Sequence, residues 1–372
     1  MQAPRLTLLL LLFSVICTPI DAGGIESEQP ADWSLLVRNS QIAEPYRFFG
    51  LASFYNEVRV DLVQQNTTQS VPADDEVRIL ASEWLVLSGR FAAHAIRAEG
   101  LTYRVDEHGL WAKGQRQNES TASGDISVTT TKAALKTIAP ELDQLRYAHL
   151  WGWLGALAKG VEVTLTFIYT HIAASWAVAI LILSLFVKLL LLPVSLLTAR
   201  LQKRVRQVQS QLLPELAQVK ANYEGEEAHE RIMAAHSRLG VSPFYTLKPM
   251  LGTFIQLPIL VAVFNALGEM QVLRGASFLW VEDLSYPDAI TQLNVAIPLL
   301  GTKLSVLPFL MTAATWLATA SVESRAEKVR LLLMSAGFLV LFYPFPAAMV
   351  LYWTATNLLQ LPLQKLLRAQ PD

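Results

Sequence analysis

A single lysine lies deep inside a long apolar segment. Residues 173–197 are long and apolar enough to cross a bilayer, which takes about 20 residues, and Lys188 lies well inside them. A charge at the bilayer centre costs about 2.5–3.5 kcal/mol, so it normally faces protein or water. Along one continuous helix Arg200 lies 12 residues further on, about 18 Å. That distance favours a hydrated cavity over a lysine snorkelling to the surface.

Other polar residues also lie within apolar segments. Ser184 lies one helical turn before Lys188, on the same face. Four more polar residues fall within later apolar segments: Gln256, Asn265, Thr354 and Asn357. Each alone is explained equally well by a hydrogen bond between helices, which is common in membrane bundles. Together with Lys188 they predict a polar concavity between helices.

Signatures of enzymes and metal sites are absent from the sequence. The run at 301–303 lacks the preceding glycine of a phosphate-binding loop, and there is no dinucleotide fingerprint or Gly-x-Ser-x-Gly elbow. His229 and His236 are seven residues apart rather than four, which excludes a metalloprotease helix. Cys17 is the single cysteine, so an intramolecular disulfide and a Cys-based zinc site are excluded. We therefore predict no enzyme activity, no cofactor and no metal.

The composition predicts a membrane protein. The chain has 372 residues, of which 52% are hydrophobic and 16% charged, and its mean hydropathy is +0.35. Soluble domains carry about 25% charged residues. The formal charge of -1 provides no basic field for nucleic acid, so no specific nucleic-acid partner is expected.

The N-terminal third differs from the rest. Residues 1–23 predict a signal peptide or an uncleaved signal anchor. Residues 24–150 predict a small soluble α+β domain on the exported side. Within it, alternation of apolar and polar residues at 57–63 and 101–105 predicts strands. The pattern at 132–145 predicts a helix interrupted by a proline.

Residues 151–171 are amphipathic and predict a helix lying in the membrane interface. The predicted spans follow within a core at 172–366; they are 173–197, 250–267, 304–320, 331–343 and 347–363. Between the first two, apolar residues recur every three or four positions on both sides of a Glu-Gly-Glu break. This pattern predicts an antiparallel helical hairpin at 199–245.

Basic residues set the expected orientation. Four of them follow the first span: Arg200, Lys203, Arg204 and Arg206. Positive flanks mark the cytoplasmic side, so the hairpin and the C-terminus should be cytoplasmic. The N-terminal domain should then lie on the opposite side.

Ten short motifs occur in a fixed order along the chain. They are TIAPELD at 137–143, WGWL at 151–154, Lys188 with Pro193, VSP at 241–243, FIQLPI at 254–259, FLW at 278–280, DLS at 283–285, FP at 345–346, VLYW at 350–353 and NL at 357–358. Over residues 131–364 the chain thus resembles the YidC/Oxa/Alb membrane-protein insertases.

The resemblance implies a polytopic α-helical membrane protein of the bacterial inner membrane. Its parts would be a five-helix insertase core, an N-terminal signal anchor, a cytoplasmic helical hairpin and a small α+β periplasmic domain. The family holds a hydrophilic groove that is open to the cytoplasm and lipid and closed on the outer side. The residues implied for this groove are Lys188, Ser184, Gln256, Asn265, Tyr352, Thr354 and Asn357.

The implied mechanism is insertion without nucleotide hydrolysis. A client lodges its polar outer segment in the groove while its apolar segment slides into lipid beside the third and fifth spans. The implied partners are nascent or small integral membrane proteins and the lipid bilayer, with the Sec translocon and the ribosome as further candidates. The hairpin, with its basic residues at Arg200, Lys203, Arg204 and Arg206, would help to receive the client.

The chain departs from the family pattern in three places. The groove cation is lysine where the family usually has arginine, and a desolvated lysine can lose its proton. The outer domain is shorter than the β-sandwich of Gram-negative relatives and is expected to keep its C-terminal part, with 84–96 as a remnant. Residues 295–305 are an apparent insertion before the predicted span at 304–320.

Two other functions stay open at this point. One is a transporter that uses Lys188 to bind a solute or ion, although transporters tend to show internal repeats with interrupted helices and none is evident here. The other is a non-inserting assembly factor that binds partners through the outer domain.

Overall fold

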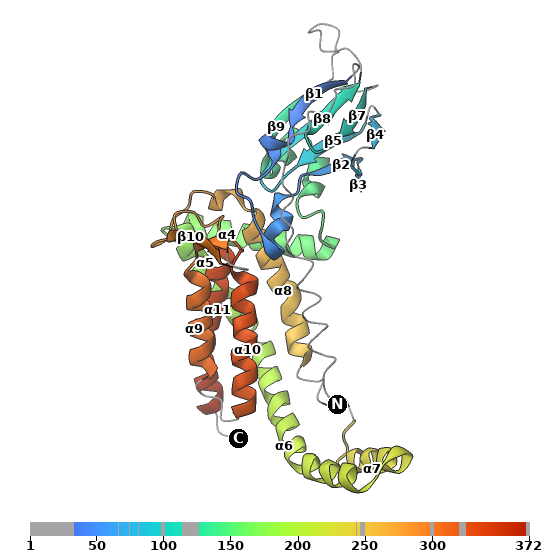
Figure 1. The fold of residues 1–372 in the computed structure, drawn as a ribbon, viewed down its shortest axis with the longest axis vertical. Coiled ribbons are helices and arrows are strands. Elements are labelled where there is room, and N and C mark those ends of the chain that lie inside the picture. Colours follow the sequence, from blue (N-terminus) through green and yellow to red (C-terminus); the bar gives the residue numbers. More distant parts are fainter. Residues whose placement is uncertain are drawn as a thin grey trace. The chain divides into compact units, whose positions relative to one another are not determined.

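The computed structural model describes residues 33–65, 67–73, 75–80, 82–97, 101–113, 126–242, 244–245, 250–297, 301–319 and 325–369. The predicted signal segment, residues 1–23, lies outside this set. The chain divides into two compact units, Met1–Arg146 and Tyr147–Asp372 (Figure 1), each described here by itself.

The first unit contains two antiparallel sheets. One sheet has the order β1 (Trp33–Arg38), β8 (Gly109–Lys113), β7 (Thr102–Val105) and β4 (Glu76–Arg78). The other has the order β3 (Thr68–Ser70), β2 (Arg59–Val63), β5 (Trp84–Ser88), β6 (Ala92–Arg97) and β9 (Ile126–Thr131). The two strands predicted from alternation, at 57–63 and 101–105, are confirmed as β2 and β7.

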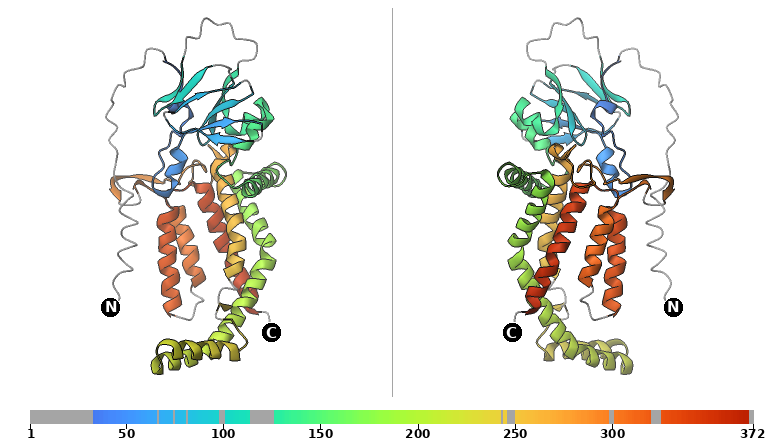
Figure 2. Two further views of the ribbon diagram at one scale, coloured as in Figure 1. Left: turned by 90° about the vertical axis from the view of Figure 1, so that its right-hand side faces the viewer. Right: turned by 90° about the vertical axis from the view of Figure 1, so that its left-hand side faces the viewer.

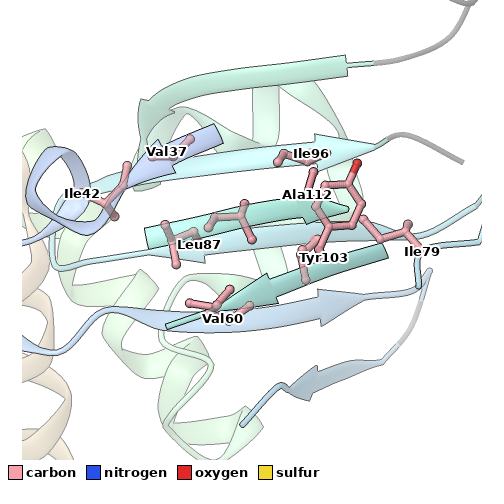
Figure 3. Packing of buried hydrophobic residues seen from close by; sticks show 11 residues of the cluster. Val37, Ile42, Val60, Ile79, Leu87, Ile96, Tyr103 and Ala112 are labelled. Carbon is pink, nitrogen blue, oxygen red and sulfur yellow. The ribbon is translucent and has the colours of Figure 1, made fainter. Parts of the chain in front are cut away.

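The two sheets form a sandwich around a shared core. Val37, Tyr103 and Ala112 of one sheet pack with Val60 and Leu87 of the other, among further apolar residues (Figure 3). Side chains alternate between the faces of a strand, so every second residue of β5 faces this core. The intervening residues face a second core instead.

That second core explains why all of β5 is buried. Trp84 and Val86 pack against Leu135 and Leu142, which follow the sheet in the sequence. The segment predicted as an interrupted helix has three parts: η2 (Lys132–Ala134), α3 (Leu135–Ile138) and η3 (Pro140–Leu145). The prediction of a helix broken by its proline is confirmed, because Pro140 starts a new helix after an extended Ala139.

The first unit contains a buried ion pair. Arg90 and Glu44 approach to 3.8 Å, and each side chain is 1% exposed. The guanidinium also lies 4.4–5.0 Å from the ring centroids of Phe48, Tyr55 and Phe91. The positive charge is thus held by a carboxylate and three aromatic faces, away from water.

The second unit is mainly helical. Its elements are α4 (Gly152–His171), α5 (Trp176–Leu190), α6 (Leu192–Asn222), α7 (Gly225–Arg238), α8 (Met250–Glu269), η5 (Gln271–Leu273), β10 (Thr291–Ile297), β11 (Gly301–Leu304), α9 (Leu307–Thr319), α10 (Arg325–Phe342) and α11 (Ala347–Ala369). Helix α11 packs against α9, α5 and α8, while α4 packs against α8 and α5, and α10 against α9 (Figure 2).

The first predicted span is not one helix. Helix α5 ends at Leu190, α6 starts at Leu192, and the two are bent by 52°. Pro193 explains the break, because a proline lacks the N–H for the preceding turn and its ring clashes with the carbonyl four residues back. The depth of Lys188 estimated along a single axis to Arg200 is therefore wrong.

Other boundaries differ from the sequence prediction as well. Helix α9 begins at Leu307 rather than 304, because the preceding residues form the β10–β11 ladder. Helix α10 begins at Arg325, so the charged segment before the fourth predicted span is already helical. Among the described residues no single helix meets the length and apolarity expected of a membrane span, whereas the bent pair α5–α6 meets them jointly.

The predicted hairpin pairing is present. Leu212 of α6 is buried with Ala235 of α7 and with Tyr245, and further residues of the predicted apolar pattern pack around them. Gly225 has a φ of +63° at the start of α7, a conformation that glycine adopts without strain. Arg238 of α7 also forms an ion pair with Glu215 of α6.

A distant carboxylate caps α9. Oδ2 of Asp288 accepts hydrogen bonds from the amides of Val306 at 2.8 Å and Leu307 at 2.7 Å, and from the indole of Trp280 at 3.2 Å. Burial raises the pKa of Asp288, although the hydrogen bonds from these donors lower it. The contact fixes the chain before β10 to the start of the helix.

Replacing Asp288 with alanine should therefore loosen the start of α9. We expect a cost of about 1–3 kcal/mol, because the part-buried amide of Val306 and the buried amide of Leu307 lose their acceptor. Hydrogen exchange of the amides at 306–310 in the detergent-solubilised chain measures this change. Asp288→Asn keeps one acceptor oxygen and should lose less, and unchanged exchange in Asp288→Ala would show that the cap is dispensable.

Candidate functional site

A polar cavity lies between four helices of the second unit. It has a volume of about 480 Å³ and is lined by residues of α5, α6, α8 and α11, with Leu191 at the α5–α6 break. The polar side chains of its lining are Lys188, Ser195, Thr198, Gln202, Arg206, Gln256, Tyr352, Thr356, Asn357 and Gln360. Among the lining residues that the structure describes there are two bases and no acid.

Lys188 stands at the end of α5. Its Nζ donates a hydrogen bond to Oε1 of Gln360 on α11. Within the described part of the chain, no carboxylate forms an ion pair with this ammonium group. The ammonium form of Lys188 is therefore paired with an amide and not with a carboxylate, which leaves its charge available to an anionic guest.

The break at Pro193 gives α6 its place in the wall of the cavity. Ser195, Thr198, Gln202 and Arg206 recur every three or four residues, so they lie along one face of α6. This polar stripe is visible in the sequence as a spacing of three or four residues, but only Arg206 of it was among the predicted site residues. Gln360 was missed as well, because it is one polar residue in an apolar helix and its partner Lys188 is 172 residues away.

Helix α8 approaches α6 closely at a glycine. A side chain at Gly252 would place its Cβ 1.9 Å from Oγ1 of Thr198. A larger residue there would push the two helices apart. Gly252 therefore sets the width of this part of the cavity.

The structure brings some of the predicted site residues together. Gln256, Tyr352 and Asn357 line the cavity with Lys188, and Arg206 from the predicted basic flank joins them. Nδ2 of Asn357 also donates to Oγ1 of Thr315 on α9 at 3.2 Å. The predicted concavity between helices thus has a counterpart that draws on three distant parts of the sequence.

Other predicted site residues lie outside the cavity lining. Ser184 is buried behind it, where its hydroxyl donates to the carbonyls of Ile180 at 2.8 Å and Tyr352 at 3.5 Å. Thr354 is buried too and donates to its own helix, to the carbonyl of Val350 at 2.7 Å. Short hydroxyl side chains often bond to their own helix in this way, which withdraws them from a cavity.

Asn265 pairs with His149 instead of facing the cavity. Of the basic flank, Arg200, Lys203 and Arg204 also lie outside the lining, because they occupy other faces of α6. The cavity can bind a polar or acidic segment without covalent chemistry. It offers two cations, four amides and several hydroxyls between the four helices.

Comparisons with known proteins point to one family. A family model described as 60Kd inner membrane protein matches residues 167–371, more than half of the chain. A membrane protein insertase YidC of Syntrophobacter fumaroxidans is 28% identical over 256 residues, covering 67% of this chain and 44% of that protein. Another, from Treponema denticola, is 29% identical over 228 residues, covering 58% of this chain and 38% of that protein. The chain spans less than half the length of these relatives.

One solved structure is similar in outline. It is described as an active YidC insertase crystal structure with the first transmembrane domain resolved. The match covers 86% of this chain and 84% of that one, with 16% sequence identity and a TM-score of 0.41.

Proposed function

This chain belongs to the YidC/Oxa/Alb family, a family of inner membrane proteins, and on that premise we propose that it is a membrane-protein insertase and chaperone. The observation that carries the proposal is the polar cavity that holds Lys188 among α5, α6, α8 and α11. The names of its relatives support insertion over solute transport, the main alternative.

The cavity acts by shortening the barrier to transfer. Moving an unpaired polar or charged group through hydrocarbon costs several kcal/mol, and much of that cost arises at the centre of the bilayer. A client's polar segment in the cavity would exchange water for the amides of Gln256, Asn357 and Gln360. Lys188 and Arg206 would add attraction for acidic segments. The client's apolar segment then enters lipid and supplies the driving force.

The topology and partners are part of the proposal. The first unit would be periplasmic and a shortened form of the relatives' β-sandwich, while the α6–α7 hairpin and the C-terminus would be cytoplasmic. Helix α4 would lie in the membrane interface, which fits its exposed Trp153, Val163 and Phe167. The clients would be nascent or small integral membrane proteins, received by the basic start of α6. The Sec translocon and the ribosome are candidate partners.

A depletion and rescue experiment tests this function. Cells depleted of their own insertase would express this chain, and the insertion of a small single-span client would be followed by protease protection. We expect insertion to be restored to a large fraction of its normal level. Failure to restore it, with the chain present in the membrane at normal abundance, would contradict the proposal.

A further inference from the structure

His149, just before α4, contacts two side chains of α8 through its two ring nitrogens. Its Nε2 lies 2.7 Å from Oδ1 of Asn265, and its Nδ1 lies 3.6 Å from Oε1 of Glu269. Both partners lie near the C-terminal end of α8, which packs along α4. The two contacts therefore tie the start of α4 to the end of α8.

The amide of Asn265 has a defined orientation. Its Nδ2 donates to the carbonyl of Val261 at 2.8 Å, and the reversed amide would set two oxygens against each other there. Oδ1 therefore faces His149 as an acceptor, which requires a proton on Nε2 of the ring. In the neutral ring, Nδ1 then carries the lone pair.

That second nitrogen faces a carboxylate. A neutral His149 points its lone pair toward Glu269, whereas the imidazolium points an N–H with positive charge. Glu269 is the last residue of α8, its side chain is 13% exposed, and the C-terminal end of a helix disfavours negative charge and favours a cation. Protonation of His149 thus turns a repulsive contact into an attractive one.

Other charged groups lie on the elements around this contact. On α4 the charged groups are Lys159 and Glu162, and the carboxylate of Glu162 accepts a hydrogen bond from the hydroxyl of Tyr147 at 3.1 Å. Arg274 follows α8 and is exposed. A small apolar cluster made of Tyr147, Leu154, Ala158 and Ala262 packs α4 onto α8 beside the polar contact.

We propose that His149 is a positioning residue whose protonated form locks the C-terminal end of α8 onto α4. Helix α8 also carries Gln256 and Gly252 into the cavity wall, so the lock would hold that wall in place. The consequence for activity rests on the proposed insertase function: a pre-organised wall should raise the rate of client insertion at mildly acidic pH.

Hydrogen exchange tests the lock without a client. The full chain in lipid nanodiscs is compared at about pH 6 and pH 8, on either side of the usual histidine titration. After correction for intrinsic exchange, amides at 262–269 should be about two- to fivefold more protected at the lower pH, the effect of one partly exposed ion pair. His149→Gln and Glu269→Gln should each bring the ratio of protection at pH 6 to protection at pH 8 close to one. His171→Gln, at the other end of α4, is the matched control and should keep the wild-type ratio.

The outcomes separate the lock from the proposed function. A wild-type ratio of one, or a Glu269→Gln chain that keeps the wild-type ratio, would overturn the lock. The same chains are then tested for client insertion at both pH values, where the pH dependence should follow the exchange ratios. Wild-type insertion that is equal at both pH values would overturn the positioning role. Absence of insertion at both pH values would count against the insertase function. The exchange data would still decide whether protonated His149 locks α8 onto α4.

Discussion

Replacing Lys188 with glutamate is expected to reduce the insertion of clients with acidic outer segments by about tenfold or more. Two unit charges 4 Å apart at a protein surface interact by about 4 kcal/mol, and tenfold corresponds to about 1.4 kcal/mol. The reversal places a carboxylate beside Gln360 in a cavity whose described lining otherwise has one base, Arg206. Insertion kinetics of a client with acidic residues in its outer segment measure the effect.

Three further chains complete this test. Lys188→Arg keeps the charge and should retain activity, while Lys188→Ala should impair the same clients less than the glutamate does. Lys220→Glu makes the same charge reversal on the exposed far part of α6 and should have little effect. Equal activity of the arginine, alanine and glutamate variants would show that the cavity charge is dispensable.

Replacing Arg90 with methionine should destabilise the β-sandwich by about 3–5 kcal/mol, because it leaves the buried Glu44 carboxylate without the cation that it contacts. The three aromatic rings around the guanidinium would lose their cation as well. Hydrogen exchange of the amides of β5 and β6 in the full chain should rise accordingly.

Two controls distinguish a buried pair from an ordinary ion pair. Arg59→Met breaks an exposed pair with Glu57 and should cost no more than about 0.5 kcal/mol. Adding Glu44→Gln to Arg90→Met removes the stranded charge and should recover part of the loss. If Arg90→Met and Arg59→Met had equal effects, the buried pair would not be a main support of the sandwich.

Local patterns in the sequence predicted much of the fold. Alternation identified β2 and β7, and the spacing of apolar residues identified the α6–α7 pairing around Leu212 and Ala235. Pro140 was correctly read as a helix break, yet Pro193 was not, because the apolar run on both sides of it resembled a single span. The short β10–β11 ladder was not predicted, because residues 295–305 stood out only as an insertion.

The candidate site was only partly predictable. A charge in an apolar run pointed to Lys188, since burying a lone charge is costly. Which polar residues accompany it depends on helix rotation and on distant partners. Asn265 has a partner in His149, 116 residues away, and Ser184 and Thr354 bond to their own helices. Tertiary packing determines which of these polar side chains face the cavity, and local spacing in the sequence does not encode that packing.

Site-specific photo-crosslinking tests most directly whether the cavity receives the client's polar segment. A photoreactive residue replaces Gln256, which lines the cavity, or Leu317, which is 63% exposed on α9 and is not part of the lining. With a client arrested during insertion, we predict crosslinks from position 256 to the client's polar outer segment and none from position 317. Equal crosslinking from both positions, or none from position 256, would contradict the account.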